Sequence, residues 1–296
     1  MRILPTLLCL FLTSSIFAQK VYVLKQNYPI GKKYDYNLTS NQIIKQKIGD
    51  QNVNLSQEIG TDYTFDIAGD KAGDKTIKVI YNRISMKSSG MGNTMTMDSD
   101  IQDPAKPNPF SGLKGASFEM TFGANGSIKS VNGLEKMLDN MASKMTKDTS
   151  QIKAIKASLG KQFSAEGMKQ TMESSFKIYP DKPVKIGDSW TVDTKMQMTM
   201  PIETITTYTL KLVKDGIAFL NVNGTLVSKG SFDSMGTKID TDLKGTNSGD
   251  MQIDLKTGLV LSSHLRLEMF GTMKAKDQNI DFDMEGINQI TGKEIN

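Results

Sequence analysis

The chain has 296 residues, of which 38% are hydrophobic and 23% charged, with 36 lysines and arginines against 32 aspartates and glutamates. This balance is typical of a globular protein and excludes a disordered or fibrous chain. One histidine and one cysteine are too few for the common zinc sites and catalytic triads, and a net charge of +4 does not indicate a nucleic-acid partner.

The N-terminus has the pattern of a secretory signal peptide. Arg2 is followed by an apolar run that ends at Phe17, and Ala18 is the small residue expected before a cleavage site. The run is shorter than the roughly 20 apolar residues of a membrane-spanning helix. We therefore expect removal of residues 1–18, and a mature protein in the periplasm or at the cell surface with no transmembrane segment.

Residues 19–131 show the two-residue period of half-buried strands. Tyr63, Phe65 and Ile67, for example, alternate with polar neighbours. Glycine- and asparagine-rich turns separate runs of this kind. This region is the first of two expected β halves.

Residues 132–180 change to a helical period. Leu134, Met137 and Met141 recur at helical spacing, and two further apolar stripes cover residues 152–159 and 163–176. The pattern predicts three amphipathic helices, each with an apolar face that needs a surface to cover.

Residues 181–296 return to the two-residue period and form the second expected β half. Several of its strands run for about a dozen residues, which is longer than the usual five or six. Leu265, Leu267 and Met269 share one strand face, as do Phe282 and Met284.

The two β halves resemble one another. The first opens on Ile30-Gly31 and the second on Ile186-Gly187, and in each an aromatic residue follows the glycine by three positions. We interpret this as a duplication. The fold class is then α+β, mostly antiparallel β: a single β-rich domain (residues 19–296) in which two related halves form one strongly curved sheet or open barrel. About three central helices would pack on its concave face, since a one-sided sheet must bury its apolar face.

Several segments carry a resemblance to a known family. The Phe17-Ala18-Gln19 ending of the leader, the opening at residues 186–190 and the segment at residues 118–133 resemble an uncharacterised exported family of Bacteroidota, a domain of unknown function. The architecture is also similar to the lipoprotein-carrier half-barrel, in which a curved sheet holds helices and an apolar cavity. The resemblance implies no reaction and no functional residue, and fold alone does not assign function.

Catalytic chemistry finds no support in the sequence. His264 lies on the polar face of its expected strand, without a paired nucleophile. The closely spaced carboxylates, such as Asp281 and Asp283, alternate along outward strand faces rather than opposing one another across a cleft. We expect a non-enzymatic protein with no cofactor and no metal site.

The 19 methionines are the unusual feature of the composition. Three interpretations remain open: core packing, a pliable apolar ligand cavity, and thioether binding of Cu(I). The favoured function is an exported binding protein for an apolar small molecule, a lipid or a lipidated partner. An envelope interaction module with a filled core is the alternative. The candidate cavity residues are Met137, Met141, Met145, Met168, Met172, Met196, Met198, Met200, Phe282 and Met284.

Overall fold

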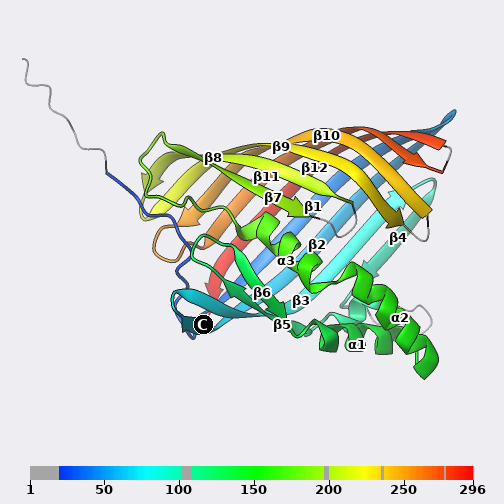
Figure 1. Ribbon diagram of the computed structural model, residues 1–296, viewed down its shortest axis with the longest axis horizontal. Coiled ribbons are helices and arrows are strands. Elements are labelled where there is room, and N and C mark those ends of the chain that lie inside the picture. Colours follow the sequence, from blue (N-terminus) through cyan, green and yellow to red (C-terminus); the bar gives the residue numbers. More distant parts are fainter. Residues whose placement is uncertain (1–19, 102–107, 197–199, 235–236, 277, 296) are drawn as a thin grey trace, which may run out of the picture.

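The computed structural model describes residues 20–101, 108–196, 200–234, 237–276 and 278–295. Long antiparallel strands dominate it, and three helices lie in the middle of the chain (Figure 1). The expected signal peptide lies outside the described residues.

Each half of the chain contributes six strands, and the helices fall between the halves. The strands are β1 Lys33–Ile48, β2 Gln51–Lys71, β3 Asp74–Gly90, β4 Asn93–Asp98, β5 Ser117–Phe122, β6 Ile128–Asn132, β7 Ser189–Met196, β8 Ile202–Lys214, β9 Ile217–Ser234, β10 Thr237–Asp254, β11 Val260–Ala275 and β12 Gln278–Ile295. The helices are α1 Leu134–Met145, α2 Thr149–Gln162 and α3 Ala165–Phe176, with a 3₁₀ turn η1 at Pro109–Gly112.

Within the described residues, all twelve strands belong to one sheet. The order is β6-β5-β3-β2-β1-β12-β11-β10-β9-β8-β7, and β4 also pairs with β3. Most neighbours are hairpins, but β1 pairs antiparallel with β12, which joins the beginning of the chain to its end. The expectation of a mostly antiparallel β protein with three helices is confirmed. The sheet is not closed, because β6 and β7 are its two end strands.

Local sequence explains where the helices begin. The side chain of Asp148 accepts hydrogen bonds from the backbone of Ser150 and Gln151 at the start of α2, and Ser164 accepts one from Gly167 at the start of α3. These side chains satisfy donors that have no partner within the first helical turn.

The three helices have different neighbours. Helix α1 packs against η1 and β5, and α2 packs chiefly against α1. Helix α3 contacts both β6 and β7, the two end strands of the sheet (Figure 1). Glu173 of α3 accepts a hydrogen bond from the backbone N–H of Ile128 in β6 at 2.8 Å. Just beyond α3, the carbonyl of Ile178 accepts one from the indole Nε1 of Trp190 in β7, also at 2.8 Å.

The main core lies where the helices and the N-terminal segment meet the sheet. Tyr36, Phe65, Phe122 and Phe176 form an aromatic group from β1, β2, β5 and α3, with ring centroids 4.8–6.1 Å apart. Such ring pairs add stabilisation beyond the area that they bury. The core therefore links the first β half to α3.

The two β halves open with the same local hydrogen bonding. In the first, the N–H of Gly31 donates to the carbonyl of Ile67, whose own N–H donates to Lys32. In the second, Gly187 donates to Leu210, whose N–H donates to Asp188.

The second strand after each opening, β2 or β8, also has matching irregularities. The pairing shifts by one residue directly after Ile67 in β2 and directly after Leu210 in β8. Both strands then enter a two-residue hairpin in which both φ angles are positive, at residues 72–73 and 215–216.

Candidate functional site

The structure separates the candidate cavity residues into different environments. Four of them lie on α1 and α3 and are 1–3% exposed within the main core: Met137, Met141, Met168 and Met172. Their side chains hold the helices to the rest of the core, which is the packing role that the sequence left open.

Three other candidates belong to a second apolar cluster. Its buried members are Leu226, Leu243, Met269, Met273, Phe282 and Met284, and partly buried Ile44, Met200, Ile202, Ile239, Leu267 and Ile280 pack against them. All of these residues come from β1 and β8–β12, apart from Met200, which precedes β8. The second cluster thus contains no residue from a helix.

The remaining candidates join neither group. Met145 and Met196 are half-buried outside both clusters, and Met198 lies outside the described residues. The sequence analysis did not identify Met269 and Met273, although both continue the inward alternation of Leu265 and Leu267 along the same strand. This alternation is the sequence pattern from which both methionines could have been assigned to the inner face.

A strip of neutral residues separates the two clusters on the same face of the sheet. Along β10, Leu243 belongs to the second cluster and Met251 to the main core, and Asn247 lies midway between them. Residues two apart on a strand share a face, so the same counting on neighbouring strands defines the strip. We call it the inner band: Ser40, Gln42, Thr204, Thr206, Gly224, Gly245, Asn247, Gly249, Gly286 and Asn288. On β11 the two clusters adjoin directly, because Leu265 packs against the main core and Leu267 against the second cluster.

The inner band is polar without being charged. Ser40 donates a hydrogen bond to the Asn288 amide oxygen at 2.6 Å, and Gln42 donates to the Ser40 hydroxyl at 2.9 Å. Ser40, Gln42, Asn247 and Asn288 are each half-buried, whereas the clusters on either side hold fully buried residues. The band can therefore offer hydrogen bonds to a neutral group but no counter-charge to an ion.

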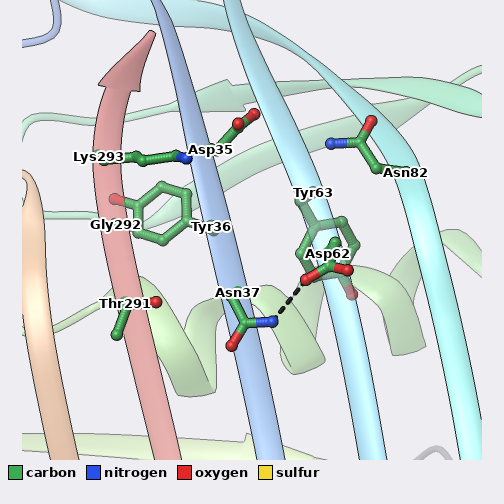
Figure 2. Close-up of a pocket in the computed structure, with 9 residues that line it drawn as sticks. All are labelled: Asp35, Tyr36, Asn37, Asp62, Tyr63, Asn82, Thr291, Gly292 and Lys293. Atoms are coloured by element: carbon green, nitrogen blue, oxygen red, sulfur yellow. Dashed lines mark hydrogen bonds between the residues drawn. The ribbon is translucent and has the colours of Figure 1, made fainter.

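The opposite, outer face of the sheet holds a polar pocket of about 430 Å³ over β12, β1, β2 and β3 (Figure 2). Figure 2 shows the Asn37 amide on β1 joined to the Asp62 carboxylate on β2, at 2.5 Å. Thr64 donates to Asp35 at 2.7 Å. These two carboxylates are thus already hydrogen-bonded to neighbouring strands. The pocket is lined by Asp35, Tyr36, Asn37, Asp62, Tyr63, Asn82, Thr291, Gly292 and Lys293.

A second outer pocket, of about 310 Å³, shares Asn37 and Thr291 with the first and contains His264. The histidine is exposed, and its Nδ1 lies 3.0 Å from the amide nitrogen of Gln289. Among the described residues, no group of three or more His, Cys, Asp or Glu side chains is placed to hold a metal ion. None of the helices in the described ranges is long and apolar enough to span a membrane.

Burial sets the ionisation of the tyrosines in the main core. Desolvation raises the pKa of Tyr28 and Tyr63 to about 12, although a side-chain hydrogen bond, from Tyr36 and Tyr81 respectively, partly lowers it. It raises the pKa of Tyr36 and Tyr179 well above 10. These phenols are therefore neutral hydrogen-bonding groups at physiological pH.

A model of a family of unknown function (DUF6263) matches residues 72–260, so the chain belongs to that family. No curated protein matches the chain. Solved structures that are similar to the chain at low identity include the following three. The COG4313 outer membrane channel from Pseudomonas putida F1 is 7% identical, with a TM-score of 0.27 over 90% of this chain and 97% of that one.

The second is OccK7 (OpdD) from Pseudomonas aeruginosa, which is 8% identical, with a TM-score of 0.21 over 89% of this chain and 99% of that one. The third is the translocator domain of the autotransporter NalP from Neisseria meningitidis, which is 8% identical, with a TM-score of 0.22 over 90% of each chain.

Proposed function

We propose that this member of the DUF6263 family is an exported, non-enzymatic binding protein that holds an apolar ligand, a lipid or a lipidated partner, on the inner face of its sheet. The observation that carries the proposal is the second apolar cluster. A domain of this size can be held together by one core, and the helices here contribute only to the main core.

The composition of the second cluster supports an adaptable binding surface. Three of its six buried members are methionines, Met269, Met273 and Met284. Methionine has an unbranched, flexible side chain that can repack around ligands of different shape. An apolar chain laid against this cluster would gain about 25 cal/mol for each Å² of surface removed from water.

We propose further that the sheet curves into an open barrel around this face. The support comes from α3, which contacts both end strands, β6 and β7. Eleven strands in a flat sheet, about 4.8 Å apart, would place those ends about 48 Å from one another. A helix about 10 Å across can contact both end strands only if the sheet bends and brings those strands close to one another.

The interpretation of the two halves as copies gains support from their matched openings. The hydrogen bonds around Gly31 and Gly187, the shifts after Ile67 and Leu210, and the hairpins that follow occur in the same order. A duplicated half with one apolar face would need its partner to enclose that face.

The alternative function, an envelope interaction module with a filled core, has its own supporting observation. Several large apolar side chains are exposed on the outer face, among them Ile205, Val227 and Phe270 at 45–55%. A protein that worked through this face would need no ligand inside.

Native mass spectrometry separates these two functions. The full chain would be produced with its leader in its own host, purified without detergent, and examined both intact and after organic extraction. We expect an apolar molecule to co-purify. Met273→Trp, which overfills the second cluster, should lose that molecule, whereas Met95→Trp on exposed β4 should keep it.

Circular dichroism on both variants checks that the fold is retained. A wild-type protein without any apolar molecule, and unable to take up an added fatty acyl ester, would contradict the proposed function and favour the interaction module.

A further inference from the structure

A row of polar side chains crosses the outer face of the sheet in register. Asn37 on β1 lies opposite both Asp62 on β2 and Thr291 on β12, and Figure 2 shows these three residues on adjacent strands. The register continues from Thr291 to Ser262 on β11, and from Ser262 to Gln252 on β10. We call these five residues the outer row. All of them line the two outer pockets, which share Asn37 and Thr291.

The outer row ends beside an aromatic side chain. Gln252 lies opposite Phe219 on β9. Because Phe219 alternates with the buried residues Ala218 and Leu220, it belongs to the outer face. It is half-buried and is a member of neither apolar cluster. Adjacent strands are about 4.8 Å apart, so the row and Phe219 together extend for about 24 Å across six strands.

The side chains of the outer row are accessible to a ligand. Each of them is exposed or half-buried. Within the part of the chain that the structure describes, the side chains of Thr291, Ser262 and Gln252 make no hydrogen bond to another protein group. Asn37 donates to Asp62 through its amide nitrogen, so its amide oxygen can still accept. The row therefore presents hydroxyl and amide groups that both donate and accept hydrogen bonds.

These groups match the chemistry of a sugar chain. Sugar hydroxyls also donate and accept, so each can pair with a hydroxyl or an amide of the row. The apolar C–H face of a sugar ring can pack on an aromatic ring such as that of Phe219. The length of the row suits several linked rings better than a single ring.

The charges around the outer row disfavour an acidic sugar chain. The two pockets contain three carboxylates, those of Asp35, Asp62 and Asp250, and one lysine, Lys293. A uronic acid polymer would bring further carboxylates close to these groups, and like charges repel. A neutral chain would meet no such repulsion.

We propose that the outer row and Phe219 form a binding site for a neutral oligosaccharide, which lies across the strands with one of its rings on Phe219. The site lies on the opposite face of the sheet from the second apolar cluster. The proposal therefore does not depend on the apolar ligand.

Isothermal titration calorimetry on the full mature chain tests the proposal with defined sugars. The neutral probes are cellohexaose, maltohexaose and the hexamer of N-acetylglucosamine, and the charged probe is the hexamer of galacturonate. We expect at least one neutral hexamer to bind, at least about tenfold more tightly than its own disaccharide, because a disaccharide cannot reach the whole row. The galacturonate hexamer should bind at least about tenfold more weakly than that neutral hexamer.

Substitutions in the site and matched controls identify the residues responsible. Phe219→Ala should weaken binding by about fivefold or more, and Asn37→Ala by roughly threefold to tenfold. Phe219→Tyr keeps an aromatic ring and should bind nearly as the wild type does. Phe270→Ala and Asn54→Ala change exposed residues eight positions along their strands from Ser262 and Asp62, and should leave binding unchanged. Circular dichroism checks that every variant is folded.

Three results would each overturn the proposal. They are failure of all three neutral hexamers to bind, equal affinity for the galacturonate hexamer, and unchanged affinity in either Phe219→Ala or Asn37→Ala. None of them would contradict the apolar binding function, because that ligand is proposed for the inner face.

Discussion

The hydroxyl oxygens of Tyr28 and Tyr36 lie 2.6 Å apart in the main core. Tyr28 belongs to the N-terminal segment and Tyr36 to β1, and both are at most 1% exposed. The same segment donates backbone hydrogen bonds from Gln26 to Ala124 in the first half and from Asn27 to Thr257 in the second. This buried pair therefore anchors the segment that spans the two β halves.

We predict that the protein loses stability in alkali through its buried tyrosines. Desolvation raises the pKa of Tyr28 to about 12 from 10.0. In the unfolded chain the phenols lose protons near pH 10, while the folded protein keeps them. The free energy of unfolding is therefore fully retained below about pH 10 and falls as the pH rises towards 12.

Circular dichroism and tyrosinate absorbance, recorded together during an alkaline titration, check this prediction. The two transitions should coincide. The prediction would be contradicted if the absorbance showed that most tyrosines were ionised near pH 10 while the circular dichroism spectrum was still native.

Glycine at position 271 of β11 is predicted to be indispensable. Its φ angle is +146°, and a Cβ atom would overlap the backbone oxygen of Asp242 on β10. Gly271→Ala should lower the free energy of unfolding by about 2 kcal/mol or more. Gly69→Ala is the matched control, since the nearest atom to its added Cβ would be Thr76 Cβ at 3.9 Å. Equal denaturant midpoints for the two variants would refute the prediction.

The helix methionines are predicted to differ in their contribution to stability. Met172 is 3% exposed in the main core, and Met172→Ala should cost about 2–5 kcal/mol through lost contacts and a cavity. Met145 is half-buried at the end of α1, so Met145→Ala should lower the free energy of unfolding by less than about 1 kcal/mol. Chemical denaturation measures both. If the losses were equal, the separation of the candidate residues into core and periphery would be wrong.

Glu173 is predicted to hold α3 to the end strand β6. Glu173→Ala removes the acceptor for the Ile128 N–H, so hydrogen exchange at that amide should accelerate by about tenfold. Glu173→Gln keeps an acceptor oxygen at the same place and should exchange nearly as slowly as the wild type. Exchange as slow in Glu173→Ala as in the wild type would contradict the prediction.

Much of the secondary structure follows from local patterns. The stripe that includes Leu134 and Met137 predicts α1, and both residues are buried. The alternation of Leu265, Leu267 and Met269 predicts one inward face of β11, where Met269 is 1% exposed. Such patterns are reliable because side-chain direction is set within one or two residues of the chain.

The candidate site could not be assembled in the same way. Methionines on helices and on strands look alike in the sequence, yet Met172 packs in the main core and Met284 in the second cluster.

The sequence by itself determined the period, length and apolar face of each element, since these depend on neighbouring residues alone. Only the tertiary structure decided that β1 pairs with β12, that α3 touches both ends of the sheet, and that a neutral band divides the apolar face. These features arise from contacts between residues far apart along the chain. Strand pairing in a particular register, rather than any local preference, brings those residues together.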